Sequence, residues 1–390
     1  MVPRPAGSQA SRDSWIRDGL RDQNPVKIIS QRSLYPSASR VSSASAAQLL
    51  CTYNWRNLAY AHIFVPGIAP TWRNIPLPVT LPRDRGTFFI DQNSARVPRH
   101  PLEPLFRAAA STNPDFRFND VDVVSDRSSL RKLLNFCADR SDGLFRLKLT
   151  LVHNSLLIER WERSSRERTT GALVSGYGHN FERAFTDYPP RVGDSTGHHR
   201  VLLYPLGHLR CAVRFEVDAC YNGPGSAKSG AKANVSQVVR RPSIKCGPRT
   251  ASTNTQVTST ASDHDMAMPQ SAAAEVKTAG KYKSSGTYLP QLWFGRTPWL
   301  IVGRHVDGTF TNVTFNNVAA EFTDWETRQQ VHLQKLVTVL VRLKEVVRRN
   351  GARACVAICE RGLRPRIIKI FAAKEDAKAL PDDLIAKFWT

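Results

Sequence analysis

The segment RFEVDAC, residues 214–220, indicates the fold class because it places two carboxylates on a largely apolar strand. Side chains alternate between the two faces of a strand, so Glu216 and Asp218 point to one side while the apolar residues between them pack on the other. Two like charges are costly to remove from water unless a positive group lies nearby. The segment therefore predicts a strand with two carboxylates on one face and a positive group close to them.

A second strand of the same kind supplies part of that cation. It is AAAEVKT, residues 272–278. Glu275 and Lys277 share one face of this strand, and Val276 lies on the other. If the strand lies beside residues 209–220, three carboxylates and one amine meet, which leaves an excess of negative charge. Hard divalent cations prefer such oxygen-rich sites, so Mg²⁺ (or Mn²⁺) is the expected cofactor.

The order of the predicted elements is informative. A helix is followed by three strands, a second helix and a further strand, at residues 178–185, 200–206, 209–220, 272–278, 288–296 and 299–305. Glu182 lies on the first helix and adds a fourth carboxylate. A carboxylate on a leading helix, one ending the second strand and Glu-x-Lys on the third form the pattern of the PD-(D/E)xK nuclease core. The expected fold is α/β (α+β), a mixed, bent β-sheet with this core in its centre and flanking helices.

The chemistry of such a core explains why these residue types occur together. The carboxylates hold a metal ion that activates water and stabilises charge at phosphorus. The lysine orients or deprotonates the water, or it balances charge in the transition state. A buried structural ion network is the alternative interpretation of the same residues.

The composition favours a polyanionic partner. The 390 residues include 55 Lys and Arg against 33 Asp and Glu, a formal net charge of +22. Nucleic acid is the commonest partner of such a chain, although a basic tail would give the same total. The run from Arg328 to Lys369 contains eleven Lys or Arg residues and two acidic ones. This run is either an RNA-backbone track or a solvated face.

The pattern along the chain predicts one interrupted domain. Residues 1–50 are rich in Ser, Arg, Pro and Ala and are expected to be a mostly disordered basic segment. Residues 51–390 form the single domain, with a flexible insertion at 221–270 that is rich in Gly, Ser, Thr and Ala. A helix is expected over 128–137, with Ser128 or Ser129 as its N-cap.

Cysteine and histidine content gives further expectations. The seven cysteines form no CxxC pair and are odd in number, which predicts a reducing compartment without structural disulfides or a zinc site. The pair His198 and His199 is expected on a solvated turn rather than at a metal. No apolar run approaches the roughly 18 residues of a membrane span, so no membrane partner is expected.

Four segments together resemble the DXO-type RNA decapping nucleases. FEVDA and EVKT resemble that family's Glu-hydrophobic-Asp and Glu-hydrophobic-Lys motifs. GYGHNFE resembles its glycine-led motif, whose metal-binding glutamate corresponds here to Glu182. DVVSDRSSLRKLL resembles the stretch whose arginine helps to bind RNA phosphate, here Arg127. LPQLWFGRTPWLIVGRHVDG is similar to the helix and strand that follow, so the resemblance covers about 80–310 without the insertion.

The resemblance implies a divalent-metal-dependent hydrolase acting on RNA 5′ ends. It would remove incomplete or unusual caps, release pyrophosphate from 5′-triphosphate RNA, or trim RNA in the 5′→3′ direction. Lys277 would assist the attacking water and Arg127 would bind substrate. The implied metal ligands are Glu182, Glu216, Asp218, Glu275 and the carbonyl of Val276. A 5′→3′ exoribonuclease is a conceivable partner, and the nucleus is the expected location, with the cytoplasm as alternative.

Three positions depart from the family pattern. Arg127 is flanked by Asp126 and Ser128, where the family has Trp and Gly. His179 replaces an apolar residue, and Gly295 replaces a Gln two residues beyond the helix Trp. These changes leave the predicted metal ligands in place but alter the surroundings of RNA. The alternative is a catalytically degenerate RNA-binding or scaffold protein of the same fold. The altered surroundings of Arg127 count for this alternative, and the presence of all the expected metal ligands counts against it.

Overall fold

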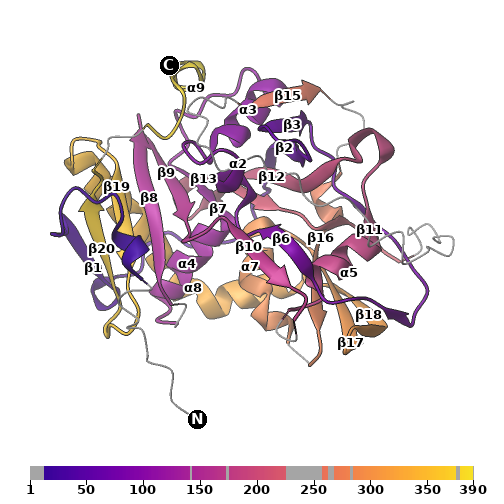
Figure 1. The fold of residues 1–390 in the computed structure, drawn as a ribbon. Coiled ribbons are helices and arrows are strands. Elements are labelled where there is room, and N and C mark those ends of the chain that lie inside the picture. The colour runs from indigo at the N-terminus through magenta and orange to yellow at the C-terminus, as the bar shows by residue number, and fades with distance from the viewer. Residues whose placement is uncertain are drawn as a thin grey trace, which may run out of the picture.

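Two β-sheets and a separate two-stranded ribbon, with helices packed around them, make up the protein (Figure 1). The computed structural model describes residues 13–140, 143–172, 175–224, 257–261, 268–281, 284–374 and 378–389. Both sheets mix parallel and antiparallel pairs, which confirms the predicted mixed α+β class.

The larger sheet contains eleven strands within these ranges. In spatial order they are β1 (Lys27–Ser30), β20 (Ile367–Ala372), β19 (Cys355–Cys359), β8 (Phe145–Val152), β9 (Ser155–Trp161), β7 (Val123–Asp126), β13 (Leu209–Glu216), β12 (Ser195–Leu206), β2 (Gln48–Arg56), β3 (His62–Val65) and β15 (Thr258–Ala261). β7 is parallel to both of its neighbours, β9 and β13, whereas β12 is antiparallel to β13 and β2.

The smaller sheet has seven strands in the described part of the chain. They are β11 (Thr186–Asp187), β4 (Thr71–Trp72), β14 (Ala219–Cys220), β16 (Ala273–Ala279), β17 (Trp299–Val306), β18 (Thr309–Asn317) and β5 (Val79–Thr80). The separate ribbon pairs β6 (Arg85–Phe89) with β10 (Arg166–Thr170) in antiparallel fashion.

Helices cover the sheets on several sides. The α-helices are α2 (Gln92–Arg96), α3 (Glu103–Thr112), α4 (Arg127–Cys137), α5 (Gly178–Phe185), α7 (Leu289–Gly295), α8 (Glu321–Arg349) and α9 (Asp382–Phe388). Short 3₁₀ turns are η1 (Ser14–Arg17), η2 (Gln31–Ser33), η3 (Pro190–Val192), η5 (Gln270–Ala272) and η6 (Ser285–Thr287). α4, α7 and α8 pack on one face of the larger sheet, and their apolar core also includes residues of β16 and β17. α3 and α9 cover the opposite face, and α5 packs on the smaller sheet.

Most of the predicted elements around the site occur, with one important change. α5, β16, α7 and β17 correspond to the helices and strands expected at 178–185, 272–278, 288–296 and 299–305. The single strand expected over 209–220 is instead divided into β13 and β14, which belong to different sheets. The division occurs because the chain leaves the larger sheet after Glu216 and pairs with the smaller sheet from Ala219 onward.

The prediction that residues 1–50 are mostly disordered is wrong for residues 13–50. β1 pairs with β20 along the edge of the larger sheet. Ile16, Leu34 and Val41 are buried in apolar clusters. These apolar residues lack helical or strand periodicity, so only the contacts with distant parts of the chain order the segment. Residues 1–12 lie outside the described residues.

The N-cap of α4 also differs from the expectation. The cap residue is Asp126, one residue before the helix, rather than Ser128 or Ser129. Its carboxylate is occupied by Arg214, whose Nε lies 2.6 Å from Oδ1. The helix therefore begins at Arg127, which places that side chain at the end of β7.

Part of the predicted insertion is ordered. Residues 225–256 and 262–267 lie outside the described residues, so the flexibility of these segments stays a prediction. Between them, β15 pairs in parallel with β3.

The six cysteines in the described ranges are free thiols, as expected for a chain without structural disulfides. None of the described helices combines the length and apolar character needed to cross a membrane.

Candidate functional site

The candidate site lies where one segment leaves the larger sheet and enters the smaller one. β13 ends at Glu216, and β14 then runs antiparallel to β16. Between them, the backbone N–H of Val276 donates to Oδ2 of Asp218 over 2.8 Å. Residues 209–220 and 272–278 are therefore neighbours, as predicted, although the contact comprises only the few residues at the junction of the sheets.

Helix α5 brings the fourth carboxylate to this junction. Asp84, far away in sequence, accepts hydrogen bonds from the backbone N–H groups of His179 (3.2 Å) and Asn180 (2.9 Å). These bonds satisfy two of the free donors at the start of the helix. Phe181 packs into the core of the smaller sheet, and the next residue, Glu182, lines the cavity described below.

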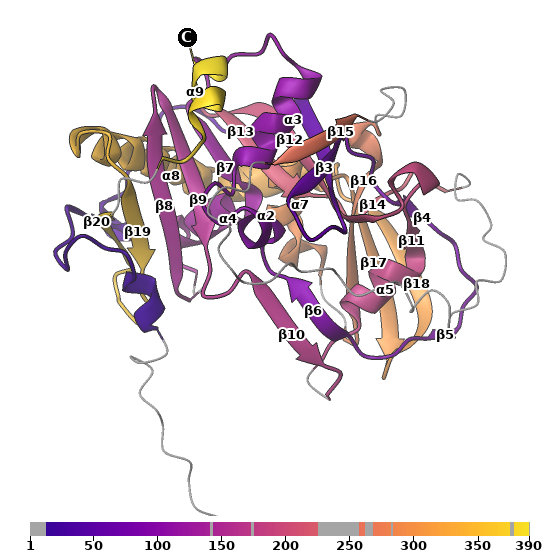
Figure 2. The same cartoon turned by 45° about the horizontal axis from the view of Figure 1, so that its top comes forward.

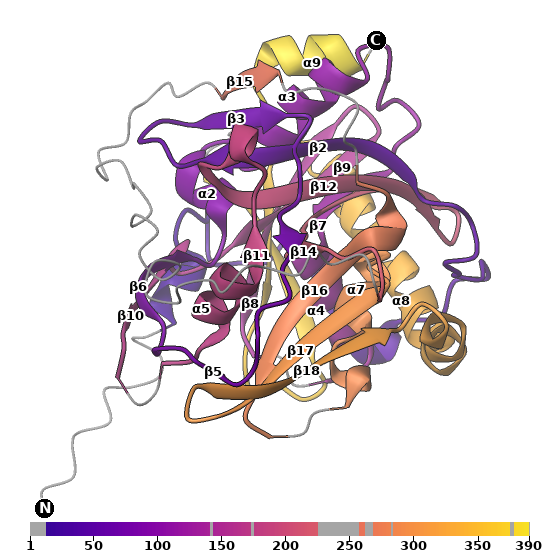
Figure 3. The same cartoon turned by 90° about the vertical axis from the view of Figure 1, so that its right-hand side faces the viewer.

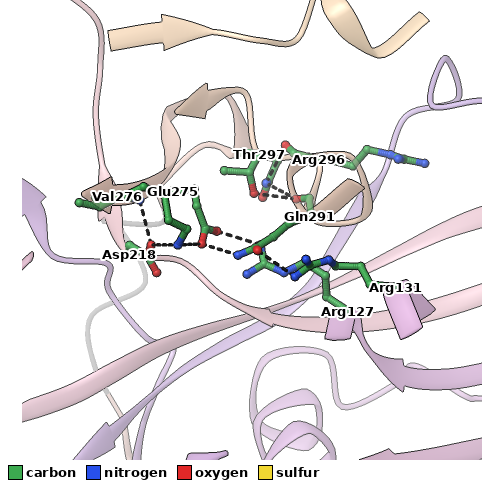
Figure 4. Close-up of polar contacts among 11 residues, drawn as sticks. Arg127, Arg131, Asp218, Glu275, Val276, Gln291, Arg296 and Thr297 are labelled. Atoms are coloured by element: carbon green, nitrogen blue, oxygen red, sulfur yellow. Dashed lines mark hydrogen bonds and ion pairs between the residues drawn. The ribbon is translucent and has the colours of Figure 1, made fainter. Parts of the chain in front are cut away.

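Glu275 is held by three donors (Figure 4). Its Oε1 accepts hydrogen bonds from Nζ of Lys277 and Nε2 of Gln291, and its Oε2 lies 3.2 Å from Nη1 of Arg127. Arg131 in turn donates to the amide oxygen of Gln291 over 2.9 Å. Because Glu275 is only 2% exposed, its charge depends on these partners rather than on water.

A cavity of about 260 Å³ opens beside this network. It contains three of the four predicted carboxylates and Arg127. The lining comprises Phe88, Phe89, Ile90, Asp91, Gln92, Asn93, Asp126, Arg127, Ser128, Arg160, His179, Glu182, Thr196, His199, Arg214, Phe215, Glu216 and Asp218. Lys277 reaches the lining through Asp218, with Nζ 3.7 Å from Oδ2. Four of the predicted site residues therefore line the cavity, whereas Glu275, Val276 and Lys277 lie behind it and contact Arg127 or Asp218.

The pKa values of the three carboxyls in the cavity wall are all raised above their usual values. Burial and the neighbouring Asp218 and Glu216 charges raise the pKa of Glu182 well above its usual value. Burial, with Asp218 and Glu275 nearby, raises the pKa of Glu216 to about 8, although its side chain is exposed to the cavity. Burial and Glu275 raise the pKa of Asp218 to about 6. Each charge is therefore opposed both by burial and by the others.

The pKa of Glu275 is shifted in the opposite direction. Burial on its own would raise the pKa of this carboxyl, but the charges of Lys277 and Arg127 lower it to about 2. Burial would likewise lower the pKa of Lys277, and the charges of Glu275 and Asp218 raise it instead. The pair is ionised at neutral pH.

The donor chemistry of the cluster fits a hard divalent cation. Its donors are carboxylate oxygens, and the raised pKa values of three of them are the mark of negative groups without a sufficient counter-charge. Among the described residues, no three His, Cys, Asp or Glu side chains already stand in an arrangement that would hold a metal ion. Glu275 contributes to this, because its carboxylate is turned to Lys277, Gln291 and Arg127.

Gln291 is a site residue that the sequence reasoning missed. The family pattern places a glutamine at position 295, where this chain has Gly295. Gln291 lies four residues earlier, and hence one turn away on the same side of α7. A Cβ atom at position 295 would lie 2.8 Å from Oγ1 of Thr297 and 3.1 Å from Nη1 of Arg127. The i, i+4 spacing of the two positions is the sequence signal that could have identified Gln291.

The expectation for His198 and His199 is wrong. Both are buried on β12, because this strand begins at Ser195 and is paired on both sides by β2 and β13. Nδ1 of His198 lies 2.7 Å from the side-chain oxygen of Asn54. His199 stacks on Tyr53, with ring centroids 4.9 Å apart, and lines the cavity. Burial and nearby arginines lower the pKa of His199 well below its usual value, so the ring is neutral.

Most of the chain matches one known family of domains. A family model described as "Domain of unknown function (DUF8563)" matches residues 23–389. A search of curated protein sequences finds no significant match.

Several solved structures share the fold. Rai1 of Scheffersomyces stipitis, in complex with (3'-NADP)+ and calcium ion, has a TM-score of 0.57 at 13% identity, covering 93% of this chain and 99% of that one. K. lactis Dxo1 in complex with manganese has a TM-score of 0.52 at 10% identity, and the match covers 91% of this chain and 99% of that one. Candida albicans Rai1 in complex with pU5-Mn2+ has a TM-score of 0.50 at 10% identity, and the match covers 90% of this chain and 98% of that one. These likenesses establish the fold, and they confirm the DXO-type resemblance at that level.

Proposed function

Because the chain belongs to the family of domains of unknown function DUF8563 and has the fold of Rai1 and Dxo1, we propose that it is a divalent-metal-dependent hydrolase acting on RNA 5′ ends. The observation that carries this proposal is the convergence of Glu182, Glu216 and Asp218 in one cavity, next to the Glu275–Lys277 pair. The reaction is removal of incomplete or unusual caps, release of pyrophosphate from 5′-triphosphate RNA, or 5′→3′ exonucleolytic cleavage.

The residues that would hold Mg²⁺ or Mn²⁺ are the four carboxylates and the carbonyl of Val276. A bound ion of this kind stabilises negative charge on a phosphate and lowers the pKa of a bound water. The Rai1 structures that contain calcium or Mn²⁺ support a divalent cation here, and the one with pU5 supports RNA as the ligand.

Two cations of the chain have separate tasks in this scheme. The ammonium of Lys277 bridges Glu275 and Asp218, so it is placed to orient the attacking water and to balance charge at the phosphate. Arg127 lines the cavity and also contacts Glu275. It can therefore bind a substrate phosphate while it keeps the Glu275 carboxylate in position.

The proposal includes two further elements that rest on the resemblance. A 5′→3′ exoribonuclease would be the protein partner and would degrade the RNA whose 5′ end has been opened. The nucleus would be the location, with the cytoplasm as alternative. The charge of +22 is consistent with a polyanionic substrate in either compartment.

A catalytically degenerate RNA-binding protein of the same fold is the second candidate. The observation in its favour is that Glu275 is engaged by Lys277, Gln291 and Arg127. In this alternative the cations of the chain replace the metal for that one carboxylate.

The deciding experiment combines stability with product analysis. The melting temperature of the protein should rise with Mg²⁺ or Mn²⁺, because a ligand that binds only the folded state stabilises it by mass action. In parallel, products from 5′-triphosphate, capped and 5′-monophosphate RNA should identify the preferred end. A protein that neither gains stability from metal nor cuts any of these RNAs is the RNA-binding alternative.

A further inference from the structure

The two-stranded ribbon β6–β10 borders the cavity, because residues of β6 line it. Figure 2 shows its two strands side by side. At its inner end, Phe88 and Phe89 belong to the cavity wall. Phe88 stacks on His179 of α5, with ring centroids 3.7 Å apart and an interplanar angle of 3°. This contact fixes one end of the ribbon at the candidate site, and the other strand positions continue away from it.

The register of the ribbon gives its two faces different chemistry. Residues directly opposite each other in an antiparallel pair share a face, and alternate residues of a strand share it too. One face therefore combines two rows, formed by Arg85, Thr87 and Phe89 on β6 and by Thr170, Arg168 and Arg166 on β10. This basic face contains three arginines, one aromatic ring and no acidic residue. The single acidic residue of the two strands, Glu167, lies opposite Phe88 and hence on the other face.

Two arginines of the basic face are available for a ligand. Arg85 and Arg168 are exposed, and within the described residues neither side chain takes part in a hydrogen bond or ion pair. Arg166 is half-buried, and its guanidinium carbon lies 5.8 Å from the centre of the Phe89 ring. The face thus offers free positive charge next to a supported aromatic ring.

We propose that the basic face of the β6–β10 ribbon binds the single-stranded RNA body that follows the 5′ nucleotide held in the cavity. Free guanidinium groups bind backbone phosphates, and an aromatic ring lets a base stack without sequence preference. This inference rests on the proposed function, because it takes the RNA chain to leave the cavity at this rim. It adds the binding surface that would give the protein a preference for RNA with a single-stranded 5′ extension.

The other basic region of the chain is not equivalent. In the run from Arg328 to Lys369, Lys344 pairs with Asp122 and Lys369 pairs with Glu360. Figure 3 shows α8, which contains the first part of this run, on the side of the molecule opposite to β6 and β10. It nevertheless offers a matched control, because Arg353 and Arg361 are exposed and their side chains make no ion pair within the described residues.

The test measures RNA binding without catalysis. The full chain is compared with the double variant Arg85→Ala/Arg168→Ala (the ribbon variant) and with the control Arg353→Ala/Arg361→Ala, and both variants remove two positive charges. Each is titrated, in EDTA and at several salt concentrations, with 5′-phosphorylated RNAs of about 20 and about 3 nucleotides, the longer of which exceeds a typical single-strand site. A further variant, Arg85→Lys/Arg168→Lys, keeps the charge.

For the longer RNA, the plot of log affinity against log salt concentration should be less steep for the ribbon variant than for the wild type, by about 1.4. This difference corresponds to an affinity about 20-fold lower at 0.1 M salt. The lysine variant and the control should keep the slope of the wild type, and the shorter RNA should bind all four proteins equally. Equal slopes in ribbon variant and wild type, an equal loss in the control, or no binding by the wild type would each overturn the inference. Ribbon-dependent binding in EDTA, together with no cleavage by the wild type when Mg²⁺ or Mn²⁺ is supplied, contradicts the proposed hydrolase alone.

Discussion

The two sides of the carboxylate cluster use the same residue types in opposite ways. On the acidic side, Glu182, Glu216 and Asp218 face the cavity and one another, and their pKa values are raised. On the cationic side, Glu275 is enclosed by donors that include Lys277, and its pKa is lowered. The difference shows that burial does not by itself decide the charge of a carboxyl. The neighbours decide it, because burial opposes ionisation on both sides.

The two sides of the cluster therefore depend to different degrees on a bound cation. The network around Glu275 is complete and contributes to the folded state without any ligand. The acidic side is electrostatically incomplete, so a cation arriving there has the larger effect. Changes on the two sides should therefore differ in kind.

Loss of Asp218 should have the largest effect. Asp218→Asn keeps the size of the side chain and an oxygen for the N–H of Val276, but it removes the charge at the junction. Hydrolysis of 5′-end-labelled RNA should fall by about 10²- to 10³-fold, the scale of losing one preorganised group that stabilises the transition state. The rise of melting temperature with Mg²⁺ should disappear, while RNA binding persists.

The control for this variant is Asp120→Asn, since Asp120 is a surface carboxylate with 85% of its side chain exposed. It should leave both readouts unchanged. Full activity of Asp218→Asn would remove the acidic side from the catalytic scheme.

Neutralising one carboxyl on each side should shift stability in opposite directions. Glu275→Gln leaves Lys277 and Arg127 without their shared anion, and breaking such a buried pair costs about 3 kcal/mol. The Glu216 carboxyl has a pKa of about 8 in the folded protein, so it has to take up a proton on folding at neutral pH. Glu216→Gln removes this cost and should raise the melting temperature in metal-free buffer. Thermal melting in EDTA measures both. If both variants shift in the same direction, the division of the site into two sides is wrong.

Gln291 should have a smaller effect, through position rather than charge. Gln291→Ala removes one of the donors to Glu275 and the acceptor of one hydrogen bond from Arg131. Activity should fall by about 10- to 100-fold, as for other residues that orient a ligand from behind. The metal concentration needed for half-maximal activity should rise as well. A fall in stability with unchanged metal dependence would restrict Gln291 to a structural role.

The smallest effect is expected far from the site. Deletion of residues 226–254 should leave the melting temperature nearly unchanged, because this Gly-, Ser-, Thr- and Ala-rich sequence has too little apolar content to offset the entropy of ordering. The deletion keeps β15 and its pairing with β3. A large drop in melting temperature would show that the segment packs against the domain.

The local sequence pattern is sufficient to predict which residues share a face and which elements carry them. Alternation along β16 places Val276 in the core beneath α5 and Glu275 on the other face, as predicted from period two. The helix carrying Glu182 also occurs where it was expected. These features are local, because the geometry of a helix or strand fixes the direction of each side chain from its position alone.

The neighbours of these faces, in contrast, depend on how the chain folds in three dimensions. The tertiary structure moved the chain from one sheet to the other between Glu216 and Ala219, capped α5 with Asp84 and selected Gln291 as the partner of Glu275. It also ordered residues 13–50 and buried His199, where the local pattern is weak. Such contacts join residues distant in sequence, and no periodicity encodes them. Their energy comes from burial and charge pairing, which exist only once the two sheets are assembled.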